Sequence, residues 1–163
     1  MSVAAPRFSE SALAEYRDVL RRYPTRRAAL MPTLWLAQRE FGWLSEPAME
    51  YVAELMELPL AWVTSVASFY TMYWKSPPAR WRLKVCRNLS CALRGGDEIR
   101  VAIEQRLGIR DGQHTADGRF ALEEVECLGS CGTAPVMQVN NGPYYERLDR
   151  AQALALIERL AAE

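Results

Sequence analysis

The sequence predicts an α+β protein in two parts, with a small helical bundle in residues 1–78 and an α/β domain in residues 79–163. In the first part, apolar residues recur at helical spacing. In the second part, short apolar runs of strand length alternate with helical segments. Two consecutive prolines, Pro77 and Pro78, separate the two patterns, and we therefore place the domain boundary there.

Length, composition and charge exclude several functional classes. Half of the 163 residues are hydrophobic, which is enough for a core, and 20 basic residues balance 20 acidic ones. Neither part forms a basic face, so we expect no nucleic-acid partner. No apolar run reaches the roughly 18 residues of a membrane span, and the first ten residues lack the apolar core of a secretory signal. We expect a cytoplasmic protein without direct membrane insertion.

Two helices open the first part. One is predicted over residues 10–22 with Ser9 as its cap, and the next over residues 27–41 with Gly42 at its end. Their core-facing residues are predicted from the helical period. They are Leu13, Tyr16, Leu20 and Tyr23 in the first helix and Leu30, Leu34, Ala37 and Phe41 in the second.

Two more helices are predicted, one starting at Ser45 and Pro47 and one after Pro59. Their predicted core-facing residues are Met49, Val52, Ala53 and Met56, then Trp62, Val66 and Phe69. The following stretch, SFYTMYW, holds more aromatic side chains than a small bundle buries. Exposed aromatic residues mark partner interfaces, so Tyr70, Tyr73 and Trp74 are interface candidates, with a place in the core as the alternative.

The second part begins with a strand–helix–strand unit. A strand over residues 81–85 leads directly into Cys86, a helix begins near Gly95, and a strand over residues 120–126 leads into Cys127. Such units are right-handed and their strands are parallel. Both cysteine-bearing loops should therefore lie at the same end of the sheet, where sites of open α/β sheets form.

A hairpin and a last helix complete the second part. Asn141 and Gly142 separate two apolar segments, residues 136–139 and 144–148, as in a hairpin turn. A capping box that starts at Asp149 opens the last helix. The predicted order is β-α-β-β-β-α.

The four cysteines are the candidate site, as two pairs with the spacings C-x4-C and C-x3-C: Cys86, Cys91, Cys127 and Cys131. Disulfides persist in oxidising compartments, for which the sequence carries no signal. Structural zinc sites favour C-x2-C hooks, and neither spacing is of that kind. A two-iron cluster places two thiolates on each iron, which suits two loops of different reach. The spacing favours a cluster and leaves zinc open.

Several segments resemble the thioredoxin-like [2Fe–2S] ferredoxin family. They are VCRNLSCALRGGDEI, DGRFALEEVECLGSCGTAPVMQVN and YYERL, preceded by MPTLWLAQREFGWLS and VASFYTMYW. The resemblance covers roughly residues 23–148 and implies a thioredoxin-like fold in the second part. It also implies a cis bond before Pro135. The ligands that it implies for one [2Fe–2S] cluster are Cys86, Cys91, Cys127 and Cys131.

The resemblance also implies a function. The matching segments are similar to the small electron-transfer subunit of NADH:quinone oxidoreductase, respiratory complex I, which implies a place on the cytoplasmic side of the membrane, peripheral to it. FMN and NADH are then expected on a larger flavoprotein partner among other subunits, and the sequence indeed lacks a G-x-G-x-x-G loop. The alternatives are the same module in a soluble NAD-linked hydrogenase or formate dehydrogenase, or a zinc-stabilised or dithiol binding module.

We predict no general acid, base or nucleophile, because one-electron transfer needs none. Reduction adds a negative charge to a site that already holds four thiolates, so nearby positive groups should offset it. Arg87 and Arg94 flank the first cysteine loop and are candidates for this role. Gly129 and Gly132 are expected to let backbone N–H groups approach the sulfurs, or else only to permit tight turns.

Overall fold

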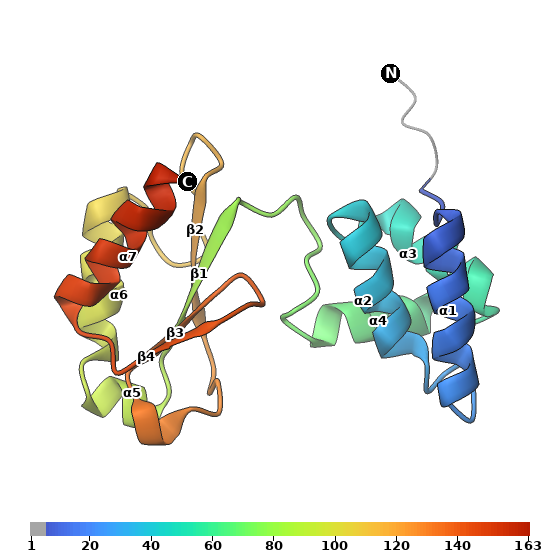
Figure 1. The fold of residues 1–163 in the computed structure, drawn as a ribbon, viewed down its shortest axis with the longest axis horizontal. Coiled ribbons are helices and arrows are strands. Elements are labelled where there is room, and N and C mark those ends of the chain that lie inside the picture. Colours follow the sequence, from blue (N-terminus) through green and yellow to red (C-terminus); the bar gives the residue numbers. More distant parts are fainter. Residues whose placement is uncertain (1–5) are drawn as a thin grey trace. The chain divides into compact units, whose positions relative to one another are not determined.

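The computed structural model describes residues 6–163 and divides into two compact units, with the boundary between Pro77 and Pro78 (Figure 1). Within these residues the first unit has four helices, and the second has three helices, one short 3₁₀-helix and four strands. The predicted α+β class is confirmed. No helix in this range is long and apolar enough to cross a membrane.

The helices of the first unit follow the local signals of the sequence. They are α1 (Glu10–Arg22), α2 (Leu30–Phe41), α3 (Glu46–Met56) and α4 (Leu60–Phe69). The side chains of Ser9 and Ser45 accept hydrogen bonds from backbone N–H groups in the first turns of α1 and α3. Gly42 ends α2 with a φ of 82°. The predicted start of α2 is three residues too early, because residues 26–29 form a turn ahead of the helix.

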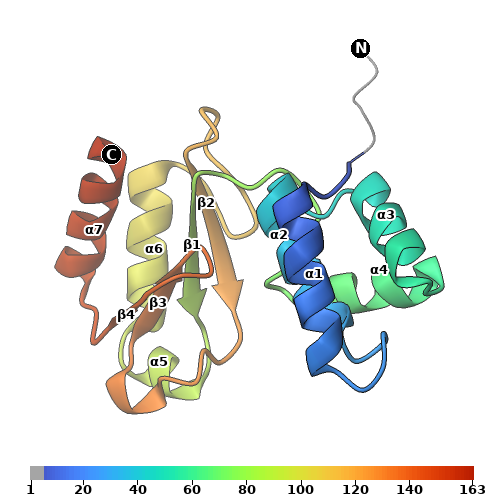
Figure 2. The ribbon, with the colours of Figure 1, turned by 45° about the vertical axis from the view of Figure 1, so that its right-hand side comes forward.

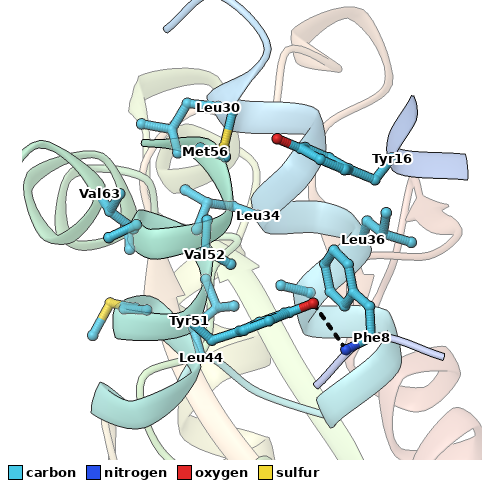
Figure 3. Packing of buried hydrophobic residues seen from close by; sticks show 14 of the residues in the cluster. Phe8, Tyr16, Leu30, Leu34, Leu36, Leu44, Tyr51, Val52, Met56 and Val63 are labelled. Atoms are coloured by element: carbon cyan, nitrogen blue, oxygen red, sulfur yellow. Dashed lines mark hydrogen bonds between the residues drawn. The ribbon is translucent and has the colours of Figure 1, made fainter. Parts of the chain in front are cut away.

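The core of the first unit joins all four helices and the segment ahead of α1 (Figure 3). Leu34, Val52 and Val63 have no exposed surface. Phe8 meets the ring of Tyr51 edge to face, with the ring centroids 5.2 Å apart. The backbone N–H of Phe8 also donates to the Tyr51 hydroxyl at 3.2 Å. This pair anchors the described start of the chain on the bundle.

The predicted core face is partly wrong for both α4 and α1; of the three residues predicted on α4, Val66 alone packs against the core, where it is half-buried. On α4 the buried residues are Val63 and Ala67, whereas Phe69 is 78% exposed. Trp62 also lies at the surface, under the Arg27 guanidinium, 4.2 Å from the ring centroid. On α1 the buried residues are Ala12, Tyr16 and Val19. Leu13 and Leu20 are half-buried and Tyr23 is exposed. Val63 and Ala67 of α4, like Ala12 and Val19 of α1, are small or β-branched and let the helix backbones approach closely, although the larger Tyr16 is also buried on α1.

The second unit is a four-stranded sheet of order β2-β1-β3-β4. Its strands are β1 (Trp81–Cys86), β2 (Phe120–Val125), β3 (Val136–Val139) and β4 (Tyr144–Glu146). β1 and β2 are parallel, as predicted, and the other two pairs are antiparallel. Figure 2 shows α6 (Gly96–Leu107) and α7 (Arg150–Ala162) on the same face of this sheet.

The core of the second unit lies between that face and the two helices. Leu83 and Val85 of β1 alternate toward it and meet Ile103 of α6 and Ile157 of α7. The capping box at Asp149 is confirmed. These contacts hold β1 and β2 in place, and thereby fix the ends of the strands from which the cysteine loops start.

The hairpin between β3 and β4 is confirmed, although β4 is shorter than predicted. The N–H of Gly142 donates to the Val139 carbonyl at 3.0 Å across the turn. The pairing ends at Glu146 because Arg147 adopts a φ of 49°, outside the extended region. The Ala134–Pro135 bond that leads into β3 is cis, as the resemblance implied.

Candidate metal centre

Parallel pairing of β1 and β2 brings the two cysteine loops together. Cys86, the last residue of β1, is in register with Val125, the last residue of β2. Both loops therefore start from the same end of the sheet. In Figure 2 α5 (Leu89–Leu93) of the first loop lies at this end, beside the 3₁₀-helix Cys131–Thr133 of the second.

The two cysteine pairs differ in exposure. Cys86 and Cys91 are each 2% exposed, whereas Cys127 and Cys131 are exposed. Cys91 lies on α5, a five-residue helix that the sequence did not predict and that Asn88 caps. The apolar residues around the buried pair are Leu128, Ala134 and Val136. One half of the site is thus covered by the protein, and the other half faces the solvent.

The thiols lie close together within the second loop, and electrostatic repulsion acts between the two pairs. The Sγ atoms of Cys127 and Cys131 are 3.5 Å apart. Burial, followed by a hydrogen bond with Cys86, raises the pKa of Cys91 to about 11. A hydrogen bond with Cys127, and repulsion from that thiol and from Cys86, raise the pKa of Cys131. Four thiolates at this place repel one another, so cations are needed to hold them together.

This donor set fits an iron–sulfur cluster. The sulfurs form two pairs, and one pair for each iron is the arrangement of a two-iron cluster. In residues 6–163 no three or more Cys, His, Asp or Glu side chains are arranged as ligands of a metal ion. A zinc ion needs its four ligands around a single point, whereas a two-iron cluster takes one pair of thiolates at each iron.

The two arginines predicted beside the site connect its two loops. Nη2 and Nε of Arg87, the residue after Cys86, lie 2.6 and 3.0 Å from Oε1 of Glu126, the residue before Cys127. Arg94 donates from Nε to the Ala134 carbonyl, three residues after Cys131, at 3.0 Å. The two arginines of the first loop thus bind the second loop at its start, through Glu126, and near its end, through Ala134. A direct action of these arginines on cluster charge stays a prediction.

The two predicted glycines of the second loop differ from each other. Gly129 adopts a φ of 81°, which L side chains rarely adopt, and its N–H donates to the Cys127 sulfur at 3.4 Å. Gly132 has no such bond to sulfur that the structure records, and a Cβ there would meet nothing within 4 Å. Only Gly129 therefore has the geometry expected of a glycine that brings an N–H group to sulfur.

Gly96 is a site residue that the sequence indicated only as the start of a helix. A Cβ at Gly96 would lie 2.9 Å from the Cys91 carbonyl oxygen and 3.3 Å from that of Cys86. The first turn of α6 therefore packs directly on the backbone of both buried cysteines. The paired glycines in the sequence were the available signal, but the contact itself arises only in the fold.

Gly96→Ala is expected to push the Cys91 backbone outward. We expect a loss of about 1–3 kcal/mol in the free energy of unfolding, as for overpacked sites, together with reduced iron retention. Urea titration and iron analysis of the purified chain measure the two effects. Gly132→Ala is the matched control, since it adds the same methyl group where there is room. Equal iron content and stability in the two variants would contradict this role of Gly96.

Glu146 is a second site residue whose role the sequence did not indicate, although it lies in the resembling segment YYERL. The hydroxyls of Ser130 and Thr133, both in the second cysteine loop, donate to its carboxylate, the latter at 2.7 Å. These hydrogen bonds lower the pKa of Glu146. The next residue, Arg147, donates its N–H to the Thr133 carbonyl at 2.7 Å. The end of β4 therefore fixes the loop that carries the exposed cysteine pair.

The predicted aromatic interface is only partly at the surface. Tyr73 is 1% exposed, and its hydroxyl donates to the Met31 carbonyl at 2.8 Å, so it is a core residue. Trp74 is half-buried, with its backbone N–H bound to Gln38. Tyr70 is exposed. An interface role remains a prediction for Tyr70 and Trp74, whereas the burial of Tyr73 leaves it no surface for a partner.

Known proteins resemble this chain over most of its length. It is 45% identical over 141 residues to an NADH-quinone oxidoreductase subunit of Rhizobium meliloti (strain 1021), covering 86% of this chain and 83% of that protein. It is 44% identical over 147 residues to NADH-quinone oxidoreductase subunit 2 of Thermus thermophilus, covering 89% of this chain and 81% of that protein.

A solved structure and a family model agree with these relatives. A chain of an NAD⁺-reducing [NiFe]-hydrogenase in the air-oxidised state superposes with a TM-score of 0.71 at 28% identity, over 82% of this chain and 23% of that one. The model of the thioredoxin-like [2Fe–2S] ferredoxins matches residues 16–161. The chain therefore belongs to the thioredoxin-like [2Fe–2S] ferredoxin family.

Proposed function

We propose that this chain is the one-electron-transfer subunit of an NADH:quinone oxidoreductase, with one [2Fe–2S] cluster held by Cys86, Cys91, Cys127 and Cys131. The observation that carries the proposal is that both cysteine loops start at the same end of two parallel, paired strands. Relatives that are 44–45% identical and bear the name of that complex support the choice of complex.

The chain's own residues would bind and shield the cluster, which supplies one-electron redox chemistry when bound. Cys86 and Cys91 bind from the protein side, where Leu128 and Val136 exclude water. Cys127 and Cys131 bind from the solvent side. The exposed pair leaves an edge at which an electron enters or leaves without a path through the core.

Hydride chemistry belongs on a partner in this proposal. The sequence holds no G-x-G-x-x-G loop for a dinucleotide, and one-electron transfer requires no acid, base or nucleophile. We place NADH and FMN on a larger flavoprotein subunit of the same complex. The chain would then associate with the cytoplasmic side of the membrane through its partners.

A soluble NAD-linked hydrogenase is the second candidate. The superposition on a chain of the NAD⁺-reducing [NiFe]-hydrogenase supports it. The same module in a formate dehydrogenase is a related possibility from the sequence resemblance. The identity of the co-purifying subunits distinguishes these complexes from a quinone oxidoreductase.

Anaerobic purification of the full chain tests the cluster and the division of labour. We expect about two irons and two sulfides per chain. Titration calorimetry with NADH should detect no binding. Zinc without iron or sulfide would contradict the cluster, and measurable NADH affinity would contradict the partner assignment. Tagged chain purified from its native cells should bring along a flavoprotein, and hydrogenase subunits there would favour the second candidate.

A further inference from the structure

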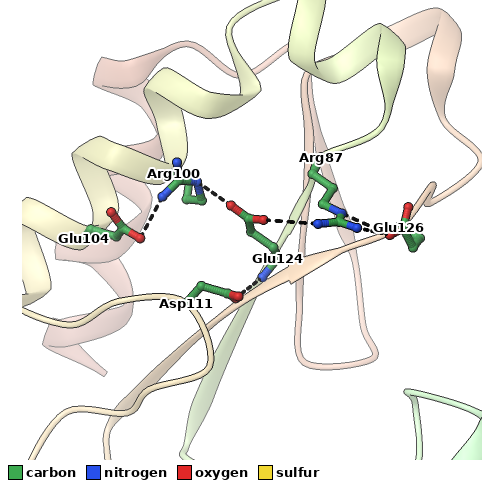
Figure 4. Close-up of polar contacts among 6 residues, drawn as sticks. All are labelled: Arg87, Arg100, Glu104, Asp111, Glu124 and Glu126. Carbon is green, nitrogen blue, oxygen red and sulfur yellow. Dashed lines mark hydrogen bonds and ion pairs between the residues drawn. The ribbon is translucent and has the colours of Figure 1, made fainter.

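A line of ion pairs runs from the first cysteine loop to α6 (Figure 4). Arg87 binds Glu126 at 2.6 Å, and its Nη1 lies 3.9 Å from Glu124. Glu124 lies 2.5 Å from Nε of Arg100, which also binds Glu104 at 2.8 Å. The Arg100–Glu124 contact is an ion pair without an aligned N–H bond. The five side chains hold three negative charges and two positive ones.

This network reaches both cysteine loops at their first residues. Arg87 follows Cys86, and Glu126 precedes Cys127. The backbone repeats the connection, because the Arg87 N–H donates to the Val125 carbonyl at 3.0 Å. The charges of Arg87 and Glu126 are therefore fixed next to one cysteine of each pair.

Two carboxylates hold the guanidinium of Arg87, so its positive charge is already offset before any cluster binds. Glu124 is itself fixed, since Asp111 accepts a hydrogen bond from its backbone N–H at 2.6 Å (Figure 4). A net negative group of this kind opposes the addition of an electron nearby, because like charges repel. The reduced cluster is more negative than the oxidised one, so the network destabilises the reduced form more than the oxidised form.

We propose that Glu126 and Glu124, by ion-pairing Arg87 between the two cysteine loops, lower the reduction potential of the cluster. The inference rests on the proposed function, since it needs a cluster at the four cysteines. Removal of a carboxylate leaves the Arg87 charge uncompensated and favours reduction. Removal of Arg87 leaves the negative charges of the carboxylates uncompensated and therefore disfavours reduction.

Potentiometric titration of the cluster-loaded full chain, followed by electron paramagnetic resonance at fixed neutral pH and low salt, tests the proposal. For Glu126→Gln we expect the ratio of reduced to oxidised cluster at the wild-type midpoint to rise about threefold, a shift of about 28 mV at 59 mV per decade. Arg87→Gln should lower the ratio by a similar factor. The double variant should return near the wild-type value. The shifts should shrink in high salt, because the pair is partly exposed.

The Arg106–Glu158 pair supplies matched controls. It joins α6 to α7 at 2.6 Å, is also partly exposed, and includes no residue of the cysteine loops. Arg106→Gln and Glu158→Gln should leave the midpoint unchanged. Glu124→Gln, expected to shift it upward, replaces Glu126→Gln if that variant loads no cluster.

Shifts of the same sign in Arg87→Gln and Glu126→Gln would mean that the pair only holds the loops together, and would overturn the proposal. Unchanged midpoints in the loaded variants would overturn it as well. A wild-type chain without iron and sulfide would instead overturn the proposed function itself.

Discussion

Alanine in place of Cys86 or Cys127 is expected to leave the purified chain with little bound iron. Each change removes one of two thiolates from an iron, and metal binding in such sites is coupled to folding. We therefore expect the second unit to unfold at lower denaturant concentration than in the loaded wild type. Iron analysis and circular dichroism in urea measure both effects. Full iron occupancy in both variants would contradict the ligand assignment.

Comparing the two variants without iron separates the effect of losing a cluster ligand from the effect of losing a buried side chain. Cys127 is exposed, so its replacement should change the free energy of unfolding of the iron-free chain by no more than about 0.5 kcal/mol. Cys86 is buried beside Val136, so its replacement should destabilise the iron-free chain as well. Leu89→Ala is the control. Leu89 lies in the first cysteine loop and is 70% exposed, so its replacement should leave the iron content unchanged.

Tyr73→Ala is expected to cost about 3–5 kcal/mol of the stability of the first unit, as for other buried aromatic residues. The ring is fully buried and packs edge to face on Trp35 at 5.9 Å. Tyr73→Phe keeps the ring and removes only the hydroxyl bond to Met31, so it should cost about 0.5–1.5 kcal/mol. Hydrogen exchange of the α2 amides in the full chain assigns the loss to this unit.

Phe69→Ala is the matched surface control for that prediction. Its ring is 78% exposed, and removal should cost less than about 1 kcal/mol. If Tyr73→Ala kept wild-type stability and impaired only assembly with partner subunits, Tyr73 would be an interface residue after all. The structure predicts instead that Tyr73→Ala destabilises the first unit, and that any loss of assembly is a consequence of that destabilisation.

Local signals predicted most of the fold. Ser9, Ser45 and Asp149 each start a helix because a side-chain oxygen accepts a backbone hydrogen bond, a contact that depends on a few neighbouring residues. The parallel pairing of β1 and β2 followed from the handedness of strand–helix–strand connections. These predictions needed no knowledge of distant contacts.

The phase of a helix depends on its neighbours, and there the sequence was less informative. The large side chains of Trp62 and Phe69 suggested the core face of α4, but Val63 and Ala67 occupy it. Side-chain size indicates how much area a residue can bury, whereas the bundle selects residues that let helices approach. The Arg27 guanidinium covers the ring of Trp62 at the surface.

The candidate site also has a part that the sequence predicts and a part that depends on distant contacts. The four cysteines and their common edge of the sheet were predictable, because spacing and topology determine them. Gly96 and Glu146 were not, since each acts on residues that lie far from it in sequence or across a turn. The partners of Arg87 were also hidden, because Glu126 is 39 positions away. The contacts that Gly96, Glu146 and Glu126 make with the cysteine loops become visible only once the chain is folded.

Because the two cysteine pairs differ in solvent exposure, they should differ in chemical reactivity when no cluster is bound. Oxidants and alkylating reagents from the solvent reach Cys127 and Cys131, whereas Cys86 and Cys91 are shielded. Chemical damage would therefore begin at the exposed pair and leave the inner pair intact. Oxidation of either exposed thiol would remove a cluster ligand before any iron is bound.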